Sequence, residues 1–206
     1  MSHQSDPRFC VLHALRVKGF AKVEVLAELT ALPQHDVEQH LTALQAEELA
    51  LFREARALWQ LSPGGRTAHA EALAADVSAG GLREALEPPY TEFLAINEQF
   101  KELCGEWQLK DGAPNDHTDG EYDAKVVARL ASIDSSAQPL CAAFSGVMER
   151  YSPYGDRLGD ALGKVQSGDH HLFTGVMCNS YHDVWMELHE DLILTLGIDR
   201  AKEGSF

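Results

Sequence analysis

Two histidines in the carboxy-terminal part of the chain have the spacing to share one buried face. When segment 170–196 is wound at about 3.6 residues per turn, His182 and His189 lie two turns apart in an apolar face, and Trp185 lies between them. The opposite face collects carboxylates that we expect to face solvent: Asp183, Glu187, Glu190 and Asp191. Imidazole rings donate and accept hydrogen bonds, so a core that receives them needs polar partners or a ligand.

Two further segments are expected to send polar side chains into the same core. Asn97 falls within the apolar stripe of segment 83–107, and Arg129 falls within that of segment 121–151. A buried polar group without a partner costs about 1–3 kcal/mol. Two interpretations follow: an internal hydrogen-bond network with buried water, or a pocket for a small anionic ligand such as an organic acid. The pocket hypothesis uses six residues: Asn97, Tyr122, Arg129, His182, Trp185 and His189.

Motifs for metal binding and for catalysis are missing from the sequence. Neither His182 nor His189 lies three residues after a glutamate, which is the Glu-x-x-His spacing of metal sites in helical bundles. Their seven-residue separation also spans about 10 Å of helix. The chain has no Gly-x-Ser-x-Gly, no P-loop and no dinucleotide fingerprint. We therefore expect no metal site, no resident cofactor and no enzymatic activity.

The elements that must position these residues form two parts. Before residue 80, apolar spacing predicts three helices over residues 9–18, 22–30 and 34–47, and then a short hairpin of segments 49–53 and 57–61. A fourth helix follows from residue 63, with Ser62 as its N-cap and Pro63 in its first turn. The Ser78-Ala79-Gly80-Gly81 stretch is the clearest break, so we place a domain boundary there. We expect residues 81–206 to form a helical bundle from segments 83–107, 121–151, 153–167 and 170–196. The predicted fold class is mostly α.

Residues 9–75 carry a resemblance to a known family. Three helices, a hairpin that ends in Trp59, and the stretch Leu61-Ser62-Pro63-Gly64-Gly65-Arg66 resemble the winged helix-turn-helix of MarR-like transcription regulators, in which Leu-Thr-Pro-x-Gly-Arg closes the wing. The resemblance implies that segment 34–47 enters the major groove while the hairpin reaches the backbone. With Val37, Leu41 and Leu44 turned inward, the implied DNA contacts are His35, Gln39, Thr42, Ala43, Arg53 and Arg56.

Charge restricts this interpretation. The formal net charge is −15, and residues 81–206 hold 22 acidic against 10 basic side chains, so this part should repel nucleic acid. Segment 34–47 has no Lys or Arg and carries Asp36, Glu38 and Glu47, whereas a DNA-reading helix normally brings cations. Two alternatives therefore stay open: a winged helix that docks a protein, and a small-molecule-binding helical protein that does not bind DNA.

Composition limits the environment of the chain. No stretch approaches the roughly 18 apolar residues of a membrane span. The first residues lack the basic start and apolar run of a signal peptide, and the four cysteines lie far apart. We therefore expect a cytoplasmic protein that does not enter a membrane. The predicted function is DNA-binding transcription regulation by a homodimer, because two recognition helices must meet successive major grooves, with the bundle sensing a small effector.

Overall fold

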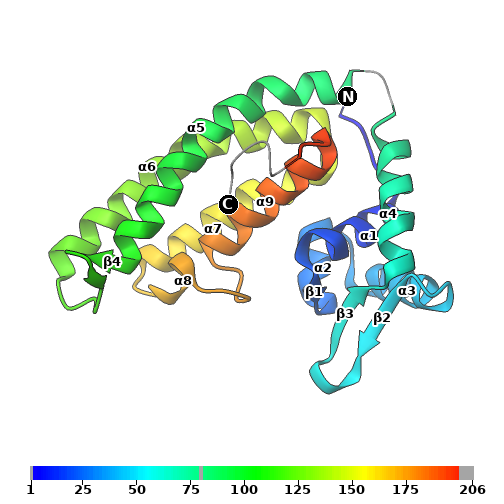
Figure 1. Ribbon diagram of the computed structural model, residues 1–206, viewed down its shortest axis with the longest axis horizontal. Helices are drawn as coiled ribbons and strands as arrows, with labels where there is room; N and C mark the ends of the chain where they lie inside the picture. Colours follow the sequence, from blue (N-terminus) through cyan, green and yellow to red (C-terminus); the bar gives the residue numbers. More distant parts are fainter. Residues whose placement is uncertain (1, 79–80, 200–206) are drawn as a thin grey trace.

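A computed structural model describes residues 2–78 and 81–199, and it is mostly helical with small antiparallel sheets (Figure 1). The first part, which we name the amino-terminal unit, contains seven main elements: α1 (Pro7–Lys18), β1 (Phe20–Ala21), α2 (Val23–Thr30), α3 (Gln34–Ala46), β2 (Ala50–Arg53), β3 (Leu58–Leu61) and α4 (Pro63–Asp76). A single 3₁₀ turn, Glu54–Arg56, joins β2 to β3. The antiparallel sheet has the order β1-β3-β2, with Phe52 opposite Trp59.

Local chemistry explains the helix ends of this unit. The Asp6 carboxylate accepts a hydrogen bond from Phe9 N at 3.1 Å and so caps α1, which Gly19 ends at a φ of 79°. Ser62 caps α4 as expected, because its Oγ accepts from Gly65 N at 2.9 Å. Pro63 then occupies the first turn, where its missing N–H is not needed.

Gly65 lets α4 approach the start of the hairpin. A Cβ atom at this position would lie 1.9 Å from the backbone oxygen of Leu49, which is a steric impossibility. The same oxygen accepts a hydrogen bond from Ser62 N at 2.9 Å. The glycine in the Pro-Gly-Gly-Arg stretch therefore fixes the hairpin against the first turn of α4.

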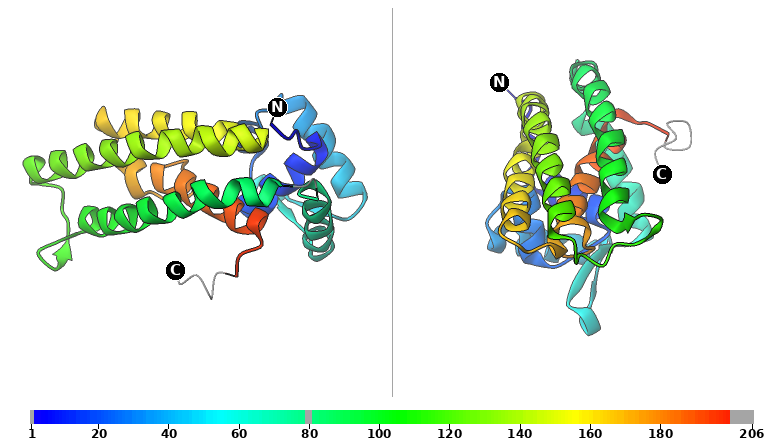
Figure 2. Two further views of the ribbon diagram at one scale, coloured as in Figure 1. Left: turned by 90° about the horizontal axis from the view of Figure 1, so that it is seen from above. Right: turned by 90° about the vertical axis from the view of Figure 1, so that its left-hand side faces the viewer.

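The second part, which we name the bundle, is built from four long helices with shorter elements between them. Its elements are α5 (Leu82–Gln108), β4 (Leu109–Lys110), β5 (Ala113–Pro114), α6 (Gly120–Val147), a 3₁₀ turn (Glu149–Tyr151), α7 (Ser152–Gln166), α8 (His171–Thr174) and α9 (Tyr181–Leu196). Figure 2 shows the long helices running side by side, with α5 on α6, α6 on α7, α7 on α9, and α9 back on α5. Phe93, Phe100, Phe144 and Trp185 are at most 1% exposed and form the centre of the core.

The prediction of one helix over residues 170–196 is wrong, because the chain leaves the helical path between α8 and α9. Met177 and Asn179 take left-handed backbone conformations, at φ values of 58° and 56°. The Asp183 carboxylate accepts from the backbone N–H groups of Cys178 and Asn179 at 2.9 and 3.1 Å. Ser180 Oγ caps the new helix by accepting from Asp183 N at 3.0 Å. Side chains thus accept from backbone N–H groups here and compete with a continuous helix.

The leading segment of the chain reaches across to the bundle. His3 N donates to Val147 O at 2.8 Å, and Glu149 N donates to His3 O at 2.9 Å. The His3 ring also lies 2.9 Å from Asp76 Oδ1, near the end of α4. This short segment therefore contacts both parts of the molecule.

Candidate functional site

The outer face of α3 is open, whereas its inner face is sealed. Val37, Leu41 and Leu44 are fully buried against α1 and α2, as their spacing predicts. The outward residues of α3 and the two hairpin arginines implied as DNA contacts are all exposed: His35, Gln39, Thr42, Ala43, Arg53 and Arg56. The hairpin β2–β3 extends beside α3 and away from the bundle (Figure 1). The structure thus leaves these six residues exposed, four on α3 and two on the hairpin that packs beside it, and Arg56 also lines a cleft that faces α9.

Some polar groups on this surface are engaged within α3 itself. Thr42 Oγ1 donates to Glu38 O at 2.8 Å, one turn back on α3. His35 Nε2 lies 2.9 Å from Asp36 Oδ1, and both side chains are well exposed. α3 itself has no Lys or Arg; the hairpin supplies Arg53 and Arg56, and Arg8 of α1 pairs with Glu47, just after α3, at 2.6 Å.

The residues predicted to line a pocket inside the bundle divide into two groups. Asn97 and Trp185 form a sealed pair, in which Trp185 Nε1 donates to Asn97 Oδ1 at 2.9 Å. The Trp185 ring stacks on Phe93 at 4.9 Å, and the buried His189 ring lies 5.3 Å from the same phenylalanine. His182, half-buried beside Phe100, has its pKa lowered by burial. These four residues take part in core packing.

The expectation that Arg129 enters the bundle core is wrong. Its side chain is exposed and pairs with Glu106 of α5. The α6 face that is buried runs through Val126, Leu130 and Ile133, and Arg129 lies about 100° around the helix from Leu130. Tyr122 accompanies Arg129 on this surface, where its hydroxyl donates to Glu106 O at 2.9 Å. The six-residue pocket is therefore not assembled.

The expectation that Glu187 and Asp191 face solvent is also wrong, since they are 5% and 2% exposed. Both faces of α9 are covered, one by the bundle core and the other by α1 and α7. The Glu187 carboxylate pairs with Lys18 of α1 and lies 2.7 Å from Arg157 of α7. Sequence reasoning missed this because it treated the amino-terminal unit and the bundle as separate bodies.

Asp191 is the centre of a buried polar network between the two parts. Its Oδ1 lies 2.9 Å from His13 Nε2 and 3.4 Å from the Arg150 guanidinium, and its Oδ2 accepts from the Tyr154 hydroxyl at 3.2 Å. Burial alone would raise the pKa of the Asp191 carboxyl, but His13 and Arg150 together hold it well below its ordinary value. Arg150 also lies 3.1 Å from Asp76 Oδ2. The network therefore keeps the charged Asp191 carboxylate and the Arg150 guanidinium together inside the molecule.

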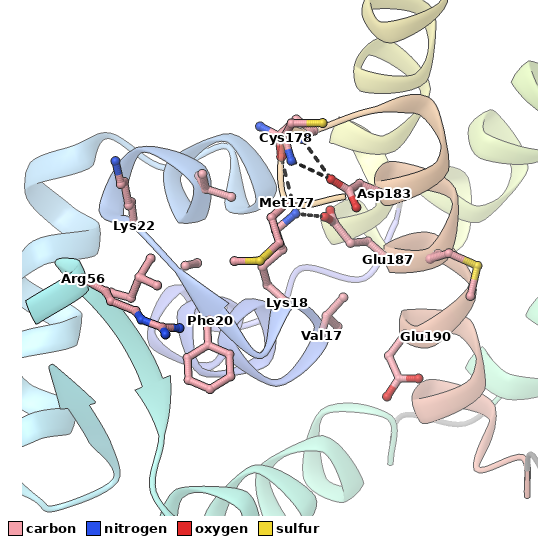
Figure 3. Close-up of a pocket in the computed structure, with 15 residues that line it drawn as sticks. Val17, Lys18, Phe20, Lys22, Arg56, Met177, Cys178, Asp183, Glu187 and Glu190 are labelled. Carbon is pink, nitrogen blue, oxygen red and sulfur yellow. Dashed lines mark hydrogen bonds and ion pairs between the residues drawn. The ribbon is translucent and has the colours of Figure 1, made fainter. Parts of the chain in front are cut away.

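A cleft of about 740 Å³, which we name the interdomain cleft, opens between α9 and the part of the amino-terminal unit formed by α1, β1, α2 and the hairpin (Figure 3). Lys22 and Arg56 of the amino-terminal unit lie on one side of it, and Asp183, Glu187 and Glu190 of α9 lie on the other. Lys18 of α1 reaches across and pairs with Glu187. Phe20 and Met177 also line it and are 51% and 72% exposed, which is unusual for large apolar side chains. The cleft can accommodate a ligand that has both an apolar body and a charged group.

The described residues hold no group of three or more His, Cys, Asp or Glu side chains arranged to bind a metal ion. Within the same residues, no helix has the length and apolarity needed to cross a membrane. Comparison with protein-family models, with curated proteins and with solved structures gives no match to this chain.

Proposed function

We propose that the protein is a DNA-binding transcription regulator whose amino-terminal unit is a winged helix-turn-helix similar to those of MarR-like regulators. The order helix, strand, helix, helix and hairpin, with β3 between β1 and β2, supports this proposal. The observation that carries it is the uncovered outer face of α3, on which Gln39 and Thr42 are exposed next to a projecting hairpin. A helix presented in this way fits the major groove, and the hairpin arginines suit the phosphate backbone.

The bundle would regulate this binding and join two copies of the chain, since two recognition helices must be held one helical turn of DNA apart. An effector such as an organic acid fits the interdomain cleft better than the bundle core, where Asn97 and Trp185 already satisfy each other. Lys22 and Arg56 could hold a carboxylate beside the exposed ring of Phe20. Because Arg56 belongs to the turn that joins β2 to β3, occupancy would bias the position of the wing.

The test is fluorescence anisotropy of the full chain with duplex DNA from its own upstream region, at several salt concentrations. Arg53→Ala and Arg56→Ala should weaken binding to every duplex, and the removal of one phosphate contact should lower the salt slope by about 0.9. Gln39→Ala should instead change the ranking of duplex sequences. Lys125→Ala, which removes an exposed cation of α6, is the matched control and should change little. The proposal fails if the chain binds no duplex at low salt, or if the control weakens binding equally.

One observation favours a second candidate function. The exposed face of α3 carries Glu38 and lacks cations, which suits a basic surface of a partner protein better than a phosphate backbone. Under this alternative, Arg53→Ala and Arg56→Ala would have no effect on DNA, because no duplex would be retained. The anisotropy experiment therefore separates the two candidates.

A further inference from the structure

A second hollow lies between α4 and the ends of the bundle helices, on α1, and we name it the arginine pocket. Its volume is about 480 Å³, and Arg16 of α1, Arg66 of α4 and Arg83 of α5 line it, together with His69. None of the described residues that line it is acidic. The chain has a formal net charge of −15, yet three guanidinium groups and no carboxylate of the described residues line this hollow, so its local charge is positive.

The three arginines are not equally engaged. Arg16 lies 2.9 Å from Glu190, and Arg83 Nε donates to Thr195 O at 2.9 Å, so both guanidinium groups are held in place by one contact each. Arg66 is exposed, and among the described residues no hydrogen bond or ion pair of its side chain is found. Arginine donates through five N–H groups, so a single bond leaves most of this donor capacity available.

His69 gives the pocket a fixed polar floor. The residue is 2% exposed, and its Nε2 lies 2.9 Å from Nδ1 of His13, which in turn contacts Asp191. This chain of contacts holds the ring in one orientation, and Phe9 stacks on it at 6.1 Å. Leu73 and Leu194 add a small apolar contribution to the lining. The arginine side chains that line the hollow, together with the fixed His69 ring, suit the binding of a compact anion.

We propose that the arginine pocket binds a small, multiply charged organic anion whose carboxylate or phosphate oxygens are shared among Arg16, Arg66 and Arg83. Arg66 belongs to the amino-terminal unit and Arg83 to the bundle, so one ligand bridges the two parts. The inference does not depend on DNA binding. The interdomain cleft, with its carboxylates and exposed apolar side chains, suits a different kind of ligand.

The experiment titrates the full chain with inorganic pyrophosphate and, separately, with citrate, at constant ionic strength set with sodium chloride. Calorimetry gives the affinity, and thermal unfolding should shift upward by about 5–10 °C when the probe exceeds its Kd a hundredfold. Stronger binding of pyrophosphate assigns the site to phosphate esters, and stronger binding of citrate assigns it to polycarboxylates. No binding of either probe beyond the chloride control overturns the proposal.

Matched variants place the binding in the pocket. Arg66→Gln should weaken the probe about 10- to 100-fold, because one charge-assisted hydrogen-bonding group is removed, and Arg66→Lys should recover part of the affinity. Arg129→Gln removes an exposed arginine on the outer surface of the bundle and should leave affinity unchanged. Equal affinities of the Arg66→Gln and Arg129→Gln variants contradict the proposal. If Arg66→Gln weakens duplex DNA but not the probe, Arg66 is a DNA contact and the pocket assignment is wrong.

Discussion

His13 of α1 and Asp191 of α9 meet at 2.9 Å between Nε2 and Oδ1, and each residue is at most 3% exposed. The pair joins the amino-terminal unit to the bundle in the buried interior of the molecule. Arg150 lies 3.4 Å from the same carboxylate oxygen. Because a buried charge is costly without its partner, this contact makes the stability of one part depend on the other.

Replacing Asp191 should therefore destabilise the whole chain. Asp191→Asn leaves Arg150 with less compensation in a buried site, and we expect a loss of about 3–5 kcal/mol in the free energy of unfolding by urea. The folded pKa of Asp191 lies below its unfolded value of about 3.9, so its contribution is present above that pH and is lost as pH falls through the folded pKa. As pH falls below about 4, the variant should lose less further stability than the wild type. Asp160→Asn, an exposed carboxylate of α7, should behave like the wild type.

His69 should produce a separate pH dependence at less acidic values. Burial, with the nearby His13 and Arg16, lowers the pKa of His69 to about 3. The unfolded chain takes up a proton near pH 6.5 while the folded chain does not, so the free energy of unfolding should fall as pH drops from about 6.5 toward 3. His69→Gln should flatten the stability profile in this window, as measured by urea unfolding at each pH. A profile unchanged by this substitution but flattened by His35→Gln would refute the assignment.

Gly65→Ala should disrupt the junction of the hairpin with α4. The added Cβ would meet Leu49 O at 1.9 Å, and the backbone must shift, at a cost of about 1–3 kcal/mol or more. Gly64→Ala is the matched control, because its Cβ would meet only Ser62 Oγ at 3.6 Å, and alanine favours a helix by about 1 kcal/mol over glycine. Thermal unfolding should show a lower Tm for the first variant and an equal or higher Tm for the second.

Substitutions of Asn97 and Arg129 should change the free energy of unfolding by different amounts, although the sequence predicts both residues in the core. Asn97→Leu leaves Trp185 Nε1 without its acceptor inside the core, which should cost about 1–3 kcal/mol. Arg129→Ala removes an exposed ion pair and should cost at most about 1 kcal/mol. Urea unfolding followed by tryptophan fluorescence measures both. A larger loss for Arg129→Ala would show that this side chain is buried after all.

The sequence predicts burial and capping correctly for residues whose surroundings depend on a single helix. Leu41 and Leu44 follow from the period of α3, and the Ser62 cap follows from the Pro that comes after it. Asp191 and Glu187 could not be placed in this way, because a helical projection shows one apolar face and does not show what covers the other. The signal that was available is the row of cations on α1, Arg16 and Lys18, which pair with carboxylates of α9.

The contact of His3 with Val147 and Glu149 has a consequence for how the chain could be divided. The leading segment ties the amino-terminal unit to the end of α6 and the 3₁₀ turn that follows it, while α1 ties it to α9. Cleavage of the peptide between Ser78 and Gly81 would therefore leave two fragments that still share a buried charge network and a short backbone ladder. Such fragments should copurify as a non-covalent complex, in the manner of a split protein that reassembles from its halves.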